Sequence, residues 1–143
     1  MLEDNLFSTA SYLKSKDHQA IAKKVIEATL AGWIYCRDHV KQCVDFTLKA
    51  GPTLPRGHQT WMMNEINKLI WPSKIGIGIM DKAAYKRTAT LMQKFGGIKK
   101  APTPGAYRTD LAAAAIASLK SQGKDVYGKS YKPIAVQLTA GGK

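Results

Sequence analysis

Two cysteines and a histidine lie close together in the segment IYCRDHVKQC, residues 34–43. On one continuous helix, Cys36, His39 and Cys43 would share a face, because helix neighbours recur every three to four residues. Two thiolates and an imidazole could hold zinc or another soft metal. A structural zinc site, however, needs a fourth ligand and usually has more closely spaced cysteine pairs. The letters RDHV also resemble a helix end followed by a new helix start, so we predict no metal and expect both cysteines to be small core residues.

The other histidines and the glycine-rich segment carry no catalytic pattern. His18 and His58 have no evident serine or cysteine partner, and no residue stands out as a nucleophile. The segment GIGIM (76–80) lacks the third glycine, the preceding strand and the acidic partner of a dinucleotide-binding turn. We therefore predict a turn at residues 76–80, and no catalytic residue, metal or cofactor in the chain.

The charge of the whole chain suggests contact with something anionic. Lys and Arg number 22 against 10 Asp and Glu, which gives a formal net charge of +12. These basic residues are spread over every segment, and only GGIKKAP and the last stretch of the chain concentrate them. Proteins that bind nucleic acid usually gather such charge on one element. A basic module that binds nucleic acid or an acidic partner is therefore an alternative, and the less favoured one.

Helical patterning dominates the elements that would position these residues. Each of five segments has apolar residues at helical spacing, and all but the first end at a glycine, a proline or both. Two pieces have weak strand character, NLFSTASYL near the start and YKPIAVQLTAGGK at the end, which could be a loose tail. The first two expected helices are residues 18–37, with Asp17 as N-cap, and residues 40–50, before Gly51 and Pro52. The third is the segment LPRGHQTWMMNEINKLIW before Pro72, and the fourth is capped by Asp81 and closed by Gly96. The fifth is LAAAAIASLKSQG after Thr109 or Asp110.

The apolar positions of the first and third helices predict which faces are buried. A helix that packs on a core usually buries one continuous apolar stripe and exposes its charged face. The expected buried residues are Ile21, Val25, Ala28, Gly32 and Cys36 in the first helix and Met62, Ile66, Leu69 and Ile70 in the third.

An ordered set of residues runs through the expected helices: Gly32–Trp33, Tyr35, His39, Asp45, Leu48–Lys49, His58–Gln59, Trp61–Met62, Ile77–Gly78, Met80–Asp81 and Thr88. This order resembles the C-terminal part of one family, the solute-binding proteins of ABC transporters of the nitrate/sulfonate/taurine and thiamine-pyrimidine type. In that family a helix of the form L.GW.YA..H precedes A.D..LK, then HQ.WM, then IG.MD...W..T, and a YTN-like segment that GAYRTDL resembles. Val40 departs from this pattern, because the family commonly has a proline after the histidine. The resemblance covers about residues 1–120.

The resemblance implies a C-terminal fragment of a longer, two-lobed protein. The expected fold is mainly α, with about five helices and one to three short strands, and is a piece of an α/β periplasmic-binding-protein fold. Residues 1–122 would be the helix-rich part of a lobe and residues 123–143 a basic tail. Cys36 and Cys43 would lie on two consecutive packing helices. Intact relatives are exported, whereas this chain shows no signal peptide and would stay in the cytoplasm if expressed as written.

The implied function is capture of a small organic solute for import through an ABC permease. The chain alone would be neither an enzyme nor competent to bind the solute. The positions expected nearest the ligand cleft are Glu3, Asp4 and Asn5, where the carboxylates could accept hydrogen bonds from a solute amine. A solvated N-terminus without a binding role is the alternative, and the more favoured one. A fragment of a thiamine-pyrimidine biosynthesis enzyme is the alternative within the same resemblance. Further expected partners are a second copy of the chain or a complementary chain.

Overall fold

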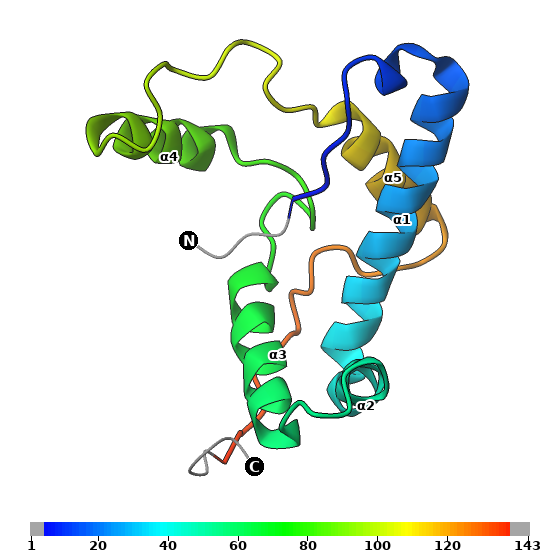
Figure 1. Cartoon of the computed structure of the whole chain (residues 1–143). Coiled ribbons are helices and arrows are strands. Elements are labelled where there is room, and N and C mark those ends of the chain that lie inside the picture. Colours follow the sequence, from blue (N-terminus) through cyan, green and yellow to red (C-terminus); the bar gives the residue numbers. More distant parts are fainter. Residues whose placement is uncertain (1–4, 138–143) are drawn as a thin grey trace.

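A computed structural model describes residues 5–137, and these residues form helices and loops without any strand (Figure 1). The mainly helical prediction is confirmed. The strands expected in NLFSTASYL and in residues 131–137 are wrong, and the end of the second piece lies outside the described residues. A short 3-10 helix, η1 (Tyr12–Lys14), precedes the helices α1 (Lys16–Asp38), α2 (Val40–Ala50), α3 (Arg56–Ile70), α4 (Lys82–Lys94) and α5 (Asp110–Ser121).

Some helix ends follow local sequence signals and others do not. Asp81 caps α4 as predicted, since its Oδ1 accepts hydrogen bonds from the N–H groups of Ala83 at 2.8 Å and Ala84 at 2.9 Å. The bonds from Ala84 and Ala83 lower the pKa of the Asp81 carboxyl, because they stabilise its charged form. The predicted cap of α1 is wrong: Ser15 occupies the N-cap position, and Asp17 lies inside the first turn.

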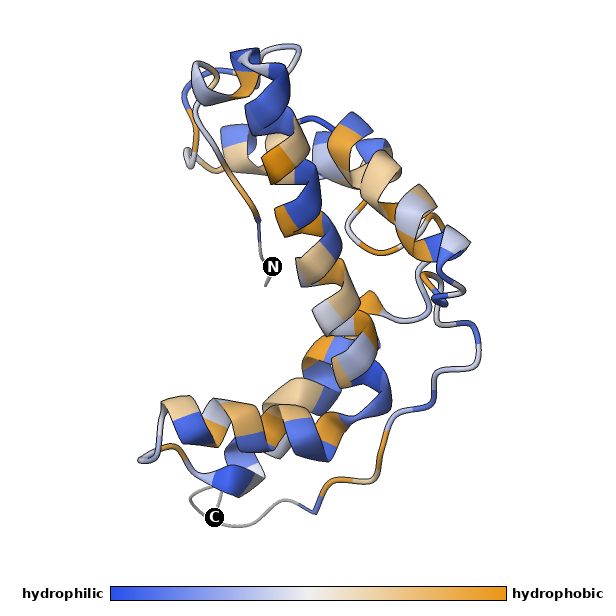
Figure 2. Cartoon of the chain, turned by 90° about the vertical axis from the view of Figure 1, so that its right-hand side faces the viewer, coloured by the Kyte–Doolittle hydropathy of each residue, from blue (hydrophilic) through white to orange (hydrophobic). Residues whose placement is uncertain are grey.

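The hydrophobic core forms where α1 packs along α5 (Figure 1). Ala112 and Ala115 of α5 are buried, and such small side chains allow close packing between α5 and α1. Figure 2 shows apolar and polar residues alternating along the helices, as expected of helices that bury one face. The buried core residues are Leu30, Ile34, Trp71, Ile77, Ala115, Ile116, Leu119 and Val126.

The buried face of α1 is not the predicted one. Leu30 and Ile34 point into the core, whereas Ile21 and Val25 are 50% and 51% exposed. In α3 the buried side chains are Asn64 and Asn67, and the predicted core residue Leu69 is 69% exposed. The apolar stripe alone did not identify the core face, because each of these helices carries apolar residues on more than one side.

Val126, Tyr127 and Tyr131, in the segment after α5, pack in or against the core. The N–H of Ile77 donates to the carbonyl of Val126 at 3.1 Å, and the N–H of Ser73 donates to the carbonyl of Tyr127 at 2.9 Å. Further along, the N–H of Ile134 donates to Asn64 Oδ1 on α3 at 3.0 Å. Residues 123–137 therefore connect the α1–α5 pair to α3.

Helix α2 packs on α3 and also touches α1, and η1 packs on α1. Helix α4 has no buried residue and packs on no other helix in the described part of the chain, where it lies apart from the bundle (Figure 1). None of the helices within residues 5–137 is long and apolar enough to cross a membrane.

The two cysteines form a disulfide, which corrects the expectation that they are separate core residues. Helix α1 ends at Asp38 and α2 begins at Val40, so the break predicted at RDHV is present. The break turns α2 so that the Cα atoms of Cys36 and Cys43 lie 5.5 Å apart and their sulfur atoms are bonded. Cys43 is buried, as predicted, and Cys36 is partly buried. The disulfide thus fixes the angle between the two helices.

Removing the disulfide should lower the free energy of unfolding by about 2 kcal/mol, because the bond closes a short loop in the unfolded chain. We expect this loss for the double variant C36A/C43A, measured by urea unfolding without reductant. Dithiothreitol should destabilise the unchanged protein to a similar extent and leave the variant unaffected. Two free thiols in the unfolded, unreduced protein would contradict the pairing.

Candidate functional site

Of the three residues predicted to bind a ligand, only Asn5 lies within the described part of the chain. Glu3 and Asp4 lie outside the described residues. Asn5 is exposed in the extended segment before η1, and no hydrogen bond joins it to another described residue. The nearby surface depression is open and is lined mainly by apolar atoms of Phe7, Ser8, Thr9 and Tyr12. Residues 5–12, the described part of this end, therefore form no polar pocket that would orient a solute.

The cysteine and histidine residues of the opening segment likewise provide no ligand set. Both sulfur atoms are engaged in the disulfide. His39 is exposed at the break between α1 and α2, with its ring 4.3 Å from the ring of Tyr35. Within residues 5–137 no group of three or more His, Cys, Asp or Glu side chains is arranged to hold a metal ion.

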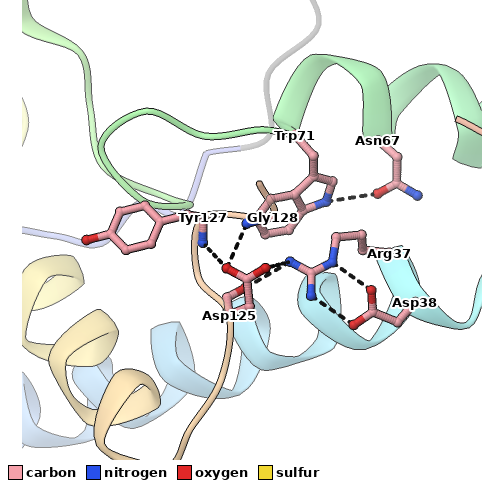
Figure 3. A network of polar contacts seen from close by, with 7 residues as sticks. All are labelled: Arg37, Asp38, Asn67, Trp71, Asp125, Tyr127 and Gly128. Carbon is pink, nitrogen blue, oxygen red and sulfur yellow. Dashed lines mark hydrogen bonds and ion pairs between the residues drawn. The ribbon is translucent and has the colours of Figure 1, made fainter. Parts of the chain in front are cut away.

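The most developed polar cluster surrounds Arg37, near the end of α1 (Figure 3). Its Nε and Nη2 donate to the two carboxylate oxygens of Asp38, at 2.7 and 2.8 Å. Its Nη1 donates to the backbone carbonyl of Asp125 at 2.8 Å and lies 3.4 Å from that residue's Oδ2. Only 7% of the Arg37 side chain is exposed. All three guanidinium nitrogens therefore have partners.

Trp71 covers the guanidinium from the side of α3 (Figure 3). The Cζ atom of Arg37 lies 4.7 Å from the centre of the Trp71 ring, a distance at which a cation is attracted by the ring's negative face. The indole Nε1 of Trp71 donates to Asn67 Oδ1 at 3.2 Å. Asn67 is fully buried, and its Nδ2 has no hydrogen-bond partner among the described residues.

Asp125 shapes the loop after α5 while it binds Arg37. Its Oδ1 accepts hydrogen bonds from the N–H groups of Tyr127 at 3.0 Å and Gly128 at 2.9 Å. One carboxylate oxygen thus orders the turn, and the other faces the guanidinium (Figure 3). Val126, which lies in this turn, is buried in the core.

The charges in the cluster stabilise one another. Hydrogen bonding from Arg37 lowers the pKa of the Asp38 carboxyl, and the same interaction raises the pKa of the Arg37 guanidinium. Both groups are therefore charged at neutral pH. A carboxyl with a lowered pKa and a fully paired guanidinium are poorly suited to proton transfer near neutral pH.

Arg37, Asp38, Asn67, Trp71 and Asp125 thus have a structural role, and we call them the Arg37 clamp. The clamp joins the end of α1, the end of α3 and the segment after α5, which are distant in the sequence. Sequence reasoning missed Arg37, Asn67 and Asp125 as a group, because nothing local indicates that residues 37 and 125 meet. The one available signal was a pair of asparagines, Asn64 and Asn67, on the same side of an apolar helix.

Replacing Arg37 by methionine should lower the free energy of unfolding by about 2–3 kcal/mol. Methionine keeps much of the apolar stem but loses the charged hydrogen bonds and the attraction to Trp71. Arg56→Met is the matched control, because the Arg56–Asp45 pair is exposed on both sides and should contribute less than about 1 kcal/mol. Equal losses in the two variants would contradict a clamp at Arg37.

The Arg37→Met effect should also depend on pH. Because the pKa of Asp38 is lowered in the folded protein, its pairing stabilises the fold fully above the ordinary carboxyl pKa of about 3.9. This contribution is lost as the pH falls through the folded-state pKa. The difference in unfolding free energy between the unchanged protein and Arg37→Met should therefore shrink from neutral to strongly acidic pH. A constant difference across that range would show that Asp38 contributes nothing to the loss.

Comparisons with protein-family models, with curated proteins and with solved structures found no match to this chain. The role of the polar cluster therefore follows from its own geometry.

Proposed function

We propose that the chain is the helical C-terminal part of a solute-binding protein for an ABC transporter. The observation that carries the proposal is the ordered set of residues that resemble that family's motifs. Several of these motifs coincide with helix ends: His39 lies at the break between α1 and α2, His58–Gln59 in the first turn of α3, and Met80–Asp81 at the start of α4. Such an ordered match at element boundaries favours a shared architecture over chance similarity of isolated letters.

The disulfide supports an exported protein. Disulfides persist in oxidising compartments such as the periplasm and are rare in the cytosol. The Cys36–Cys43 bond therefore fits the location of the intact family better than a cytoplasmic one.

The apolar surface supports a partner that completes the lobe. Ile21 and Val25 on α1 point away from the α5 contact and are half exposed. Exposed apolar patches of this kind are usually covered by association. In the proposed architecture they pack on the sheet of a two-lobed protein, or on a second copy of this chain when that sheet is absent.

The genomic DNA upstream of the Met1 codon tests the family assignment. We expect a coding sequence for a first lobe and a signal peptide on the same strand, either in frame or as a neighbouring split frame. Upstream DNA that encodes neither would contradict the proposal.

Sedimentation equilibrium at micromolar concentration tests the partner surface. The unchanged chain should form a dimer or larger assembly, and I21S/V25S should shift the equilibrium towards the monomer. L69S is the control, because Leu69 is exposed to a similar degree on another helix. A compact monomer that unfolds cooperatively and binds no hydrophobic dye would show that the chain completes its own core.

A further inference from the structure

Helix α4 combines an apolar face and a basic face, and neither is covered by another helix in the described part of the chain. It begins at the Asp81 cap and continues to Lys94, followed by Phe95 and two glycines. It contributes nothing to the core described above, so its pattern calls for a different explanation.

The apolar face is built from residues at helical spacing. Ala84, Tyr85, Leu91, Met92 and Phe95 fall on one side of the helix when successive residues are placed at the helical angle. Leu91 and Phe95 are 54% and 77% exposed, and Met92 is also exposed. Near the start of the helix, Tyr85 contacts the ring of Tyr107 at 4.6 Å. The last turn and Phe95 are the most exposed part of this face, although Lys94 Nζ lies 5.7 Å from the centre of the Phe95 ring.

The opposite face of α4 is basic, and two further lysines follow the helix. Residues 81–100 together contain six Lys and Arg residues and one acidic residue, which gives a net charge of +5. The single acid, Asp81, is engaged in capping the helix. None of the six cations forms an ion pair with another described residue. They are Lys82, Lys86, Arg87, Lys94, Lys99 and Lys100.

We propose that α4 docks on an anionic phospholipid surface, with its axis parallel to that surface. Leu91, Met92 and Phe95 would enter the boundary between headgroups and acyl chains, while the lysines and Arg87 remain at the level of the lipid phosphates. A helix with Lys and Arg on one face and Leu and Phe on the other has the pattern of interfacial membrane helices. The charge of the lipid complements the positive charge of the segment.

Charge also separates this occupant from a second copy of the chain. Two copies of α4 would bring two strongly positive segments together, which opposes association through this face. Nucleic acid would satisfy the lysines, but it would leave the apolar side without a role. An anionic lipid surface accommodates both faces at once.

Cosedimentation of the full chain with lipid vesicles tests the proposal. Binding is expected to vesicles of mixed phosphatidylcholine and phosphatidylserine and not to phosphatidylcholine alone, and it should weaken as salt screens the charges. In K86Q/K94Q, affinity should fall about fivefold for each lysine removed. In L91S/F95S it should fall by about tenfold or more, because the apolar insertion is lost.

Two control variants show whether a loss of binding comes from α4 itself rather than from a lower net charge of the chain or from unfolding. K41Q/K49Q removes two exposed lysines from α2, and L69S removes an exposed leucine from α3. Both should bind as the unchanged protein does, and circular dichroism should show that every variant is folded. Equal binding to neutral vesicles, or equal losses in the controls, would overturn the proposal. Duplex DNA binding that K86Q/K94Q weakens and L91S/F95S leaves intact, without vesicle binding, would instead show a nucleic-acid surface and overturn it.

Discussion

Replacing Leu119 by alanine should lower the free energy of unfolding by about 3–4 kcal/mol. Leu119 is 1% exposed and lies in the core where α5 meets α1. Truncating such a side chain removes its apolar burial and leaves a cavity that the surrounding helices fill only in part. Urea unfolding followed by circular dichroism measures the loss. This is among the largest effects expected from a single substitution in the chain.

Leu69→Ala is the matched control for that measurement. The same atoms are removed, but Leu69 is 69% exposed, so the loss should stay below about 1 kcal/mol. A Leu119 loss no greater than the Leu69 loss would contradict the assignment of the core to the α1–α5 contact. It would instead agree with the sequence-based prediction that Leu69 belongs to the buried stripe of α3.

The positions of the helices were largely predictable, because short-range signals set them. Asp81 caps the start of α4 by accepting two hydrogen bonds from N–H groups within three residues of it, and Pro72 follows the end of α3. Gly51 marks the end of α2. Each of these signals acts within a few residues, so neither the rest of the fold nor a partner is needed to interpret it.

The packing faces were not predictable in the same way. Helix α1 has apolar residues on two sides, and the side that is buried is the one that α5 covers. Which side of α1 is buried depends on the small residues of α5 and on the segment at Val126, which packs in the same core. Both lie far from α1 in the sequence, so the pattern within α1 could not distinguish Leu30 and Ile34 from Ile21 and Val25.

The disulfide and the Arg37 clamp could not be predicted from the sequence, because both depend on the angles between helices and loops. A break at residues 37–40 was predicted, but Cys36 and Cys43 were expected to be two separate core residues, and the angle that brings them together was not predicted. Arg37 meets a loop 88 residues away. A sequence shows that a basic residue ends a helix, which is common, but it does not show which backbone carbonyl that residue will reach.

Gly128→Ala tests how tightly the clamp is packed, and it should cost about 3 kcal/mol of unfolding free energy. Gly128 has φ +59°, a left-handed conformation that costs other residues about 1–2 kcal/mol. A Cβ added there would lie 2.5 Å from Cε3 of Trp71 and 3.1 Å from Nη1 of Arg37. Either the indole must move away from the guanidinium or the loop must shift, which adds a further cost of overpacking.

Gly123→Ala separates the two contributions. Gly123 has φ +74°, but an added Cβ would meet no described atom within 4 Å, so this variant carries the backbone cost alone, about 1 kcal/mol. Unfolding curves of the two variants give the difference directly. Near-ultraviolet circular dichroism should change in Gly128→Ala, where Trp71 is displaced, and not in Gly123→Ala. Equal losses with unchanged spectra would mean that Trp71 does not pack against the 125–128 turn, and the clamp would then lack its cover over Arg37.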